Sequence, residues 1–190
     1  SISNTQSGLR GVSFGDSLIK RVVADLLAEF PKLRHFATLS PIPGFRQWLL
    51  KQGDAVLAQW PAKQQAAMGK ALGGTAPVQA AQLLQACENL QQWSTHHVLR
   101  KAIMACAAHY LVKGMDKGRP LDPVARFHLG NGARVERINW AADVSSKGIK
   151  QSLGLMVNYL YDLKRLDRHR ASLAQGKVPA SKEVEAWLKE

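Results

Sequence analysis

A glycine-rich turn that leads directly into a strongly amphipathic segment constrains the fold of this chain more than any other feature. The turn is Arg10-Gly-Val-Ser-Phe-Gly15, and apolar residues then recur at helical spacing between residues 16 and 30. This pattern predicts a helix with one buried face, with Asp16 as a capping carboxylate at its start and Pro31 closing it. Because free N–H groups and the dipole at a helix start attract anions, the turn is a candidate anion-binding loop. Most glycine-rich turns are only tight turns, so this signal is weak by itself.

The chain of 190 residues carries a formal net charge of +12, which suits either a nucleic-acid partner or a phosphorylated coenzyme. The basic residues are spread along the chain, and their densest cluster, residues 164–170, lacks interleaved aromatic side chains. Charge alone therefore leaves both interpretations open. No apolar run approaches the ~20 residues that span a bilayer, and no signal-peptide pattern opens the chain. Cys87 and Cys106 lack metal or redox spacing, so we expect buried free thiols in a reducing compartment.

Two prolines follow a predicted short strand at residues 35–39, in the turn Ser40-Pro-Ile-Pro-Gly-Phe45. The prolines fix the backbone directly after Ser40, which is what a positioned hydroxyl requires. From the local sequence alone, a solvent-facing serine in a strand-to-helix turn is the simpler interpretation. A helical pattern resumes at residues 45–50.

Residues 54–113 are rich in Ala, Gln and Leu and predict two or three packed helices, with breaks near residues 73–74 and 94–95. Their histidines, His96, His97 and His109, have no carboxylate partner at ligand spacing, so we interpret them as surface or packing residues and expect no metal site. Residues 113–120 predict a loop.

The remainder predicts a short helical turn and two strands. Asp122-Pro123 is a strong helix start for residues 122–126, and a turn follows at residues 131–132. Strands are expected at residues 134–140 and 153–161, with a polar connection at 147–152. In the first strand Val135 and Ile138 fall on opposite faces; in the second, residues 155, 157, 159 and 161 share one face. The segment after Asp162 is basic and peripheral, with a final helix capped by Ser181. The fold class is α/β (α+β).

Several of these segments resemble the malonyl-CoA decarboxylase family. They are Ser-Pro-Ile-Pro-Gly-Phe (40–45), Asp-Pro-Val-Ala-x-Phe-His-Leu-x-Asn-Gly-Ala (122–133), Arg-Ile-Asn-Trp (137–140) and Gly-Leu-Met-x-Asn-Tyr (154–159). The opening turn is similar to the coenzyme A pyrophosphate loop of the GNAT acyltransferase fold, although Ser13 stands where a glycine is usual. The resemblance runs from Ser1 to about Tyr161.

The resemblance implies the C-terminal part of a GNAT-like catalytic domain, with a helical insertion at about 54–113 and a peripheral segment at about 163–190. A helical domain and the first strands of the sheet would precede this chain, so we expect the segment alone to be weakly active or inactive. The family also implies a homo-oligomer, and a cytoplasmic location for a bacterial-type member, mitochondrial in eukaryotic relatives. No nucleic-acid or membrane partner is expected.

The implied reaction is the decarboxylation of malonyl-CoA to acetyl-CoA and CO2. A β-carboxy thioester loses CO2 to leave an enolate, so the protein must desolvate the carboxylate, stabilise the oxyanion and supply a proton, without a metal or cofactor beyond the coenzyme A of the substrate. The family pattern assigns Ser40 and His128 as the catalytic pair, with the imidazole as proton donor because its ordinary pKa lies near neutrality. Asn158 and Tyr161 are candidates for orienting the pair. The expected coenzyme A-binding residues are Arg10, Gly11, Val12, Ser13, Phe14, Gly15 and Asp16.

Two alternatives stay open at this point. A GNAT-type acyl-CoA-dependent N-acyltransferase would transfer the acyl group to an amine without releasing CO2. A non-catalytic module that binds coenzyme A or nucleic acid would also fit the basic charge, and a steep salt dependence of DNA binding would favour it.

Overall fold

The computed structural model describes residues 15–87 and 97–189, and the chain divides into two compact units, residues 1–36 and 37–190. The first unit contributes one described element, helix α1 (Gly15–Glu29), which confirms the predicted helix. Because α1 begins at Gly15, Asp16 lies in its first turn and not at the cap. Val23 is buried, whereas Leu18 and Val22 are exposed. The candidate anion-binding loop at residues 10–14 lies outside the described residues.

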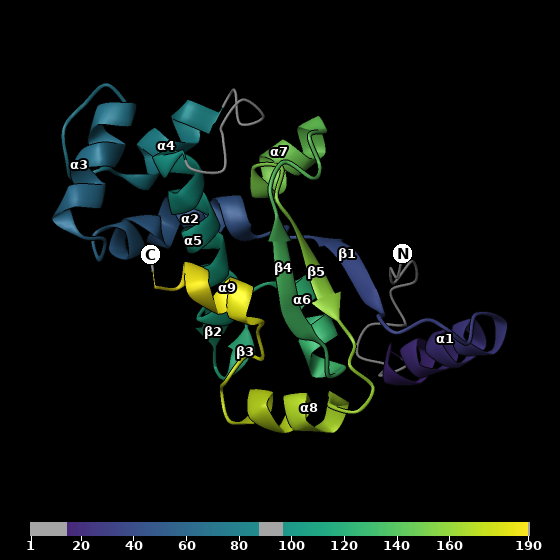
Figure 1. Ribbon diagram of the computed structural model, residues 1–190. Coiled ribbons are helices and arrows are strands. Elements are labelled where there is room, and N and C mark those ends of the chain that lie inside the picture. Colours follow the sequence, from purple (N-terminus) through teal and green to yellow (C-terminus); the bar gives the residue numbers. More distant parts are fainter. Residues whose placement is uncertain (1–14, 88–96, 190) are drawn as a thin grey trace, which may run out of the picture. The chain divides into compact units, whose positions relative to one another are not determined.

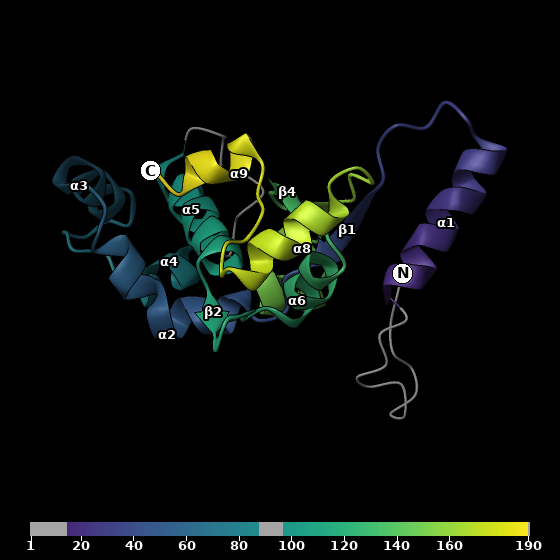
Figure 2. The same cartoon turned by 90° about the horizontal axis from the view of Figure 1, so that it is seen from below.

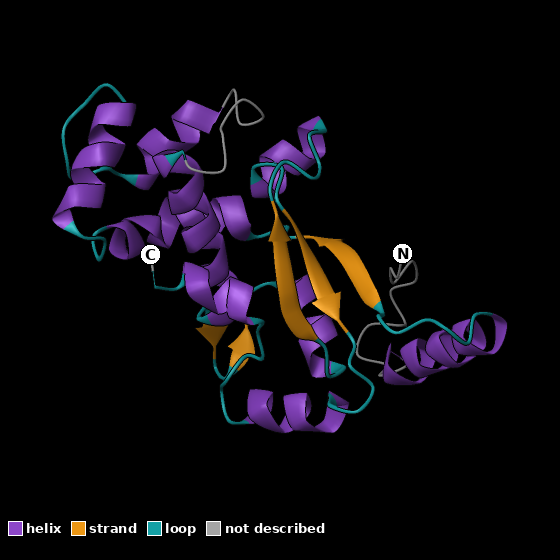
Figure 3. Cartoon of the chain, viewed as in Figure 1, coloured by secondary structure: helices purple, strands orange, loops and turns teal. Residues whose placement is uncertain are grey.

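A three-stranded antiparallel sheet forms the centre of the second unit (Figures 1 and 3). Its strands are β1 (Ala37–Pro41), β4 (Arg134–Asn139) and β5 (Met156–Leu160), in the order β1-β5-β4. The predicted alternation in β5 is confirmed, because Leu155, Val157, Tyr159 and Tyr161 are all buried. The register places Ser40 of β1 opposite Val157, so the serine lies on this buried face.

The prediction for the faces of β4 was wrong. Val135 and Ile138 are both buried, although strict alternation puts them on opposite faces. A register shift between Val135 and Arg137 inserts one extra residue opposite β5, and this bulge returns Ile138 to the buried face.

The helical region 54–113 is confirmed as packed helices. Helix α2 (Phe45–Leu57) is longer than predicted and is followed by α3 (Ala62–Ala71), α4 (Ala80–Ala86) and α5 (Val98–Val112). The predicted break at residues 73–74 falls between α3 and α4, and the one at 94–95 lies outside the described residues. Helix α5 is buried along most of its length and packs against α2, α3 and β4, so it is the centre of the helical layer.

Three connections differ from the predictions. A short hairpin, β2 (Met115–Asp116) and β3 (Arg119–Pro120), replaces the expected loop, with Lys117 and Gly118 at positive φ in its two-residue turn. The turn at 122–126 extends into a full helix, α6 (Pro123–Gly130). The polar connection at 147–152 is a helix, α7 (Ser146–Ser152), which lacks an apolar stripe but gains a cap from Ser145.

The C-terminal segment contains α8 (Leu166–Ala174) and α9 (Lys182–Trp187), and Ser181 caps α9 as predicted. Helix α8 lies beside α6 in Figure 2, and α9 packs against α5 and β4. The segment exposes most of its basic side chains, but Leu166, Val178 and Val184 are buried. It therefore also adds to the core behind the sheet.

Candidate active site

Ser40 and His128 come from distant parts of the chain and meet in the second unit. Ser40 lies in β1, and His128 lies in the last turn of α6. Their side chains are hydrogen-bonded, with Oγ 3.1 Å from Nε2 across 88 residues of sequence. Each residue is only 6% exposed. The structure thus brings the two predicted catalytic residues together, and it places Ser40 in the strand instead of the turn.

The imidazole of His128 is held on three sides. The ring of Tyr159 stacks on it at 4.5 Å between centroids, and Phe127 contacts it edge-on at 5.1 Å. Nδ1 lies 2.6 Å from the hydroxyl of Tyr161, one of the two residues predicted to orient the pair. Since β5 supplies Tyr159 and leads into Tyr161, one strand fixes both the plane and the rotation of the imidazole.

A chain of hydrogen bonds extends from Tyr161 to Thr38. Ser40 Oγ donates to Thr38 Oγ1 at 3.1 Å, so the serine oxygen is left to accept from Nε2–H of His128. In that tautomer Nδ1 carries no proton and accepts from the Tyr161 hydroxyl. The proton of the imidazole therefore lies on Nε2, the nitrogen that faces the serine.

Burial changes the protonation state that we expected for His128. Desolvation lowers its pKa from 6.5 to about 4. The ordinary pKa near neutrality, from which the proton-donor role was predicted, does not apply here, because the ring lies under Tyr159 and beside Phe127, away from water. At neutral pH the imidazole is neutral, so it can give up its Nε2 proton only if a second proton reaches Nδ1.

Asn158, the other predicted orienting residue, does not contact Ser40 or His128. Its amide nitrogen donates to the backbone carbonyl of Thr38 at 2.8 Å, and its amide oxygen accepts from Asn139 at 2.8 Å. The two amides link all three strands next to the serine. Asn158 can therefore influence the pair only by holding Thr38, the residue to which Ser40 donates.

Sequence reasoning missed Thr38 and Tyr159. Thr38 would have been found if Ser40 had been placed in the strand, because residues two apart share one face of a strand. The sequence places Tyr159 on one strand face with residues 155, 157 and 161 but gives it no part in the site. Its ring packs on the imidazole itself.

The residues of the predicted coenzyme A loop are not among the described residues of the second unit, which holds Ser40 and His128. Residues 10–14 lie outside the described part of the chain, and Gly15 and Asp16 lie in the first turn of α1, in the other unit. Among residues 15–87 and 97–189, no group of three or more His, Cys, Asp or Glu side chains could hold a metal ion. Cys87 and Cys106 are free and buried as predicted, and burial raises the pKa of each thiol to about 12.

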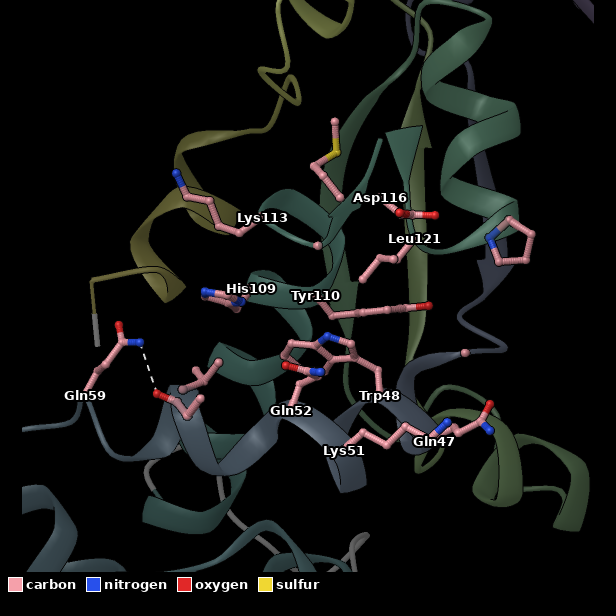
Figure 4. A pocket seen from close by; sticks show the side chains of 16 residues that line it. Gln47, Trp48, Lys51, Gln52, Gln59, His109, Tyr110, Lys113, Asp116 and Leu121 are labelled. Carbon is pink, nitrogen blue, oxygen red and sulfur yellow. Dashed lines mark hydrogen bonds between the residues drawn. The ribbon is translucent and has the colours of Figure 1, made fainter. Parts of the chain in front are cut away.

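A cavity of about 690 Å³ lies elsewhere, between α2, α5 and the β2–β3 hairpin (Figure 4). Trp48 and His109 stack within it at 5.9 Å, so His109 is a packing residue, as expected. His97 caps α5, and His96 lies outside the described ranges. The lining includes neither Ser40 nor His128, so the cavity is separate from the pair. None of the described helices is long and apolar enough to cross a bilayer.

Comparisons with known proteins give one consistent result. All of the chain, residues 1–190, matches the family model described as the malonyl-CoA decarboxylase C-terminal domain. A mitochondrial malonyl-CoA decarboxylase of Rattus norvegicus is 40% identical over 194 residues, covering 97% of this chain and 39% of the relative. The corresponding protein of Anser anser anser is 36% identical, with 99% and 39% covered.

Solved structures agree with the sequence relatives. The crystal structure of malonyl-CoA decarboxylase from Cupriavidus metallidurans superposes with a TM-score of 0.86 at 50% identity, covering 99% of this chain and 47% of that one. The enzyme from Rhodopseudomonas palustris gives a TM-score of 0.78 at 40% identity, with 98% and 40% covered. The chain spans less than half the length of these relatives. It belongs to the malonyl-CoA decarboxylase family, in which it corresponds to the C-terminal domain.

Proposed function

We propose that the protein containing this chain decarboxylates malonyl-CoA to acetyl-CoA and CO2, with Ser40 and His128 as its catalytic residues. The observation that carries the proposal is the buried series of hydrogen bonds from Tyr161 through His128 to Ser40. It occurs in a polypeptide whose relatives are malonyl-CoA decarboxylases. The Cα–carboxylate bond breaks, its electron pair moves into the thioester as an enolate, and one proton is taken up at the α-carbon.

The two side chains divide this chemistry. The site is shielded from water, which favours loss of a charged carboxylate as neutral CO2. The Ser40 hydroxyl donates to the thioester oxygen when the substrate displaces its contact with Thr38, and this stabilises the enolate. Nε2–H of His128 then passes to the α-carbon while the Tyr161 proton moves to Nδ1. The imidazole stays neutral throughout, in agreement with its lowered pKa. After the product leaves, Nδ1 returns its proton to the Tyr161 phenolate and Nε2 takes one proton from solvent, which restores the starting tautomer.

The test is CO2 release from malonyl-CoA by the full-length protein, comparing wild type with Ser40→Ala and His128→Ala. Each variant should lose roughly 100- to 1,000-fold in kcat, the size expected for removing one preorganised oxyanion donor (Ser40) or one general acid (His128). In D2O the product should carry one solvent deuteron at its methyl carbon. Turnover at the wild-type rate in both variants would refute the site assignment.

We further propose that residues 10–16 bind the pyrophosphate of coenzyme A, supported by the helix start at Gly15 and the similarity of this turn to the GNAT loop. Arg10→Ala should raise KM for malonyl-CoA at nearly constant kcat, because in this proposal the arginine binds the pyrophosphate of the coenzyme and not the malonyl group that reacts. A fall in kcat with unchanged KM would contradict this assignment. The GNAT-like arrangement of the sheet, the homo-oligomer and the cytoplasmic location also remain proposals, and light scattering of the full-length protein would test the oligomer.

A further inference from the structure

Asp122 is a buried carboxylate that the proposed reaction does not use. It is 1% exposed and lies where the start of α6, the end of α5 and the turn after β1 meet. One carboxylate oxygen accepts from the backbone N–H groups of Val124 and Ala125, each at 2.9 Å. Its second oxygen lies 3.4 Å from the hydroxyl of Tyr110, and a Cβ at Gly44 would lie 3.9 Å from that same oxygen, so the carboxylate faces the turn after β1. These contacts exceed the helix cap that the sequence predicted.

The segments joined by Asp122 are those that carry the catalytic pair. Gly44 follows Ser40 by four residues, through two prolines and the fully buried Ile42, so a shift at Gly44 is transmitted to the serine. Asp122 itself begins the eight-residue helix whose last turn holds His128. One carboxylate is therefore bonded to the helix of the histidine and packed against the segment of the serine.

We propose that Asp122 is a positioning residue for the decarboxylation. Its carboxylate caps α6 and packs against the turn after Ser40, and so fixes the 3.1 Å contact between Ser40 Oγ and His128 Nε2. This inference rests on the proposed function, because it assumes that the pair is catalytic.

The close packing at Gly44 provides a second way to disturb the contact between Asp122 and the turn after Ser40. A Cβ at this position would collide with the hydroxyl oxygen of Tyr110 and would lie 3.9 Å from the second carboxylate oxygen of Asp122. The backbone φ of Gly44 is −92°, which any residue adopts, so close approach and not conformation requires glycine. Without that hydroxyl, the nearest ring atom is 3.4 Å away, an ordinary contact. In Figure 4 Tyr110 lies between Trp48 and Leu121, so its ring cannot easily turn aside.

The first experiment uses Asp122→Asn in the full-length protein. Asparagine still caps α6 through its amide oxygen, but its amide nitrogen replaces the oxygen that faces Gly44 and Tyr110 and cannot accept a hydrogen bond, so the change is confined to the side of the serine segment. We expect kcat for malonyl-CoA to fall roughly 10- to 100-fold, the effect of misplacing catalytic groups by about 1 Å, with KM changed less than about threefold. In the Ser40→Ala background the same substitution should cost less than about twofold, because Asp122 acts through Ser40.

The matched control is Ser181→Ala, which removes the cap of α9 and leaves the junction untouched. It should destabilise the protein without a change in kcat. Circular dichroism and thermal unfolding of every variant show whether the fold is retained.

The second experiment disturbs the same contact from the other side. Gly44→Ala should lower kcat by a similar factor, since the new methyl group pushes the turn away from Tyr110 and Asp122. Adding Tyr110→Phe removes the colliding oxygen and should restore kcat to within about threefold of the Tyr110→Phe single variant. This compensation distinguishes positioning from a general loss of stability.

A folded Asp122→Asn variant with kcat within twofold of wild type overturns the proposal. So does an equal loss of kcat in the wild-type and Ser40→Ala backgrounds, which would mean a general structural role. If Asp122→Asn does not fold, the absence of compensation between Gly44→Ala and Tyr110→Phe overturns it. Full activity of both Ser40→Ala and His128→Ala refutes the proposed function instead, whatever the Asp122 variants do.

Discussion

The hydrogen bond between Tyr161 and His128 allows a prediction with a matched control, Tyr159, two residues earlier on the same face of the strand. Replacing Tyr161 by Phe removes the hydroxyl that lies 2.6 Å from Nδ1 and leaves this buried nitrogen without that donor. A buried group that loses its partner costs about 1–3 kcal/mol, which corresponds to roughly 5- to 150-fold in rate. The neutral ring can also move its proton to Nδ1, which leaves Nε2 with nothing to give to the enolate. We therefore expect kcat to fall within this range while KM for malonyl-CoA stays nearly constant.

Tyr159→Phe is the control, measured in the same CO2-release assay with the full-length protein. The Tyr159 hydroxyl is buried without a hydrogen-bond partner among the described residues, while its ring stacks on His128. Removing only the hydroxyl keeps the stacking, so kcat should stay within about twofold of wild type. The reasoning would fail if Tyr161→Phe had wild-type kcat, or if both phenylalanine variants lost the same factor.

Three further predictions concern pH, backbone geometry and Thr38. Burial lowers the pKa of His128 from 6.5 to about 4, so as the pH falls the unfolded chain takes up a proton at this residue before the folded chain does. The free energy of unfolding should therefore fall by up to about 3 kcal/mol between pH 6.5 and 4. Urea unfolding of His128→Gln should show a smaller fall over the same range. Gly132→Ala, at φ +86°, puts a Cβ 2.7 Å from the backbone of α8 and should destabilise the folded protein by more than about 2 kcal/mol. Gly176→Ala, at φ +76° in open space, should cost only about 1 kcal/mol. Equal melting temperatures of the two variants would contradict this prediction. Thr38→Val should lower kcat several-fold, because it removes the hydroxyl that accepts a hydrogen bond from Ser40. Thr38→Ser keeps this hydroxyl and should keep the wild-type kcat. Equal kcat values for the two variants would exclude a role for the Thr38 hydroxyl.

The fold could be predicted where the pattern is regular and buried. Residues 155, 157, 159 and 161 are all apolar or aromatic and share one strand face, and the structure buries that face. The β4 bulge could not be predicted, because one extra residue changes the face of Ile138 without changing the composition. Helix α7 was missed for a related reason, since its seven mostly polar residues show no apolar periodicity and a serine cap alone does not distinguish a helix from a turn.

The site was predictable in its residues and not in its physical state. The family motifs point to Ser40 and His128, and the structure places them in contact. Their environment depends on tertiary packing, since the ring of Tyr159 and the burial of His128 lower a pKa that the sequence places near neutrality. Asp122 shows the same limit. Its cap is a local signal, whereas its packing against Gly44 joins residues 78 positions apart in sequence (122 − 44), which no local pattern reveals.

The strand order β1-β5-β4 has a consequence for synthesis of the protein. The strand that pairs with β1 arrives late, since Thr38 and Asn158, which bond across this pair, are 120 residues apart. At roughly 5–20 residues per second, the ribosome needs about 6–24 s to make the intervening chain. During this interval β1 lacks β5 as its partner, and an unpaired strand edge can join another chain. Nascent chains are therefore most exposed to misassembly before residue 160 emerges, and a folding helper that shields residues 37–41 would act in that window.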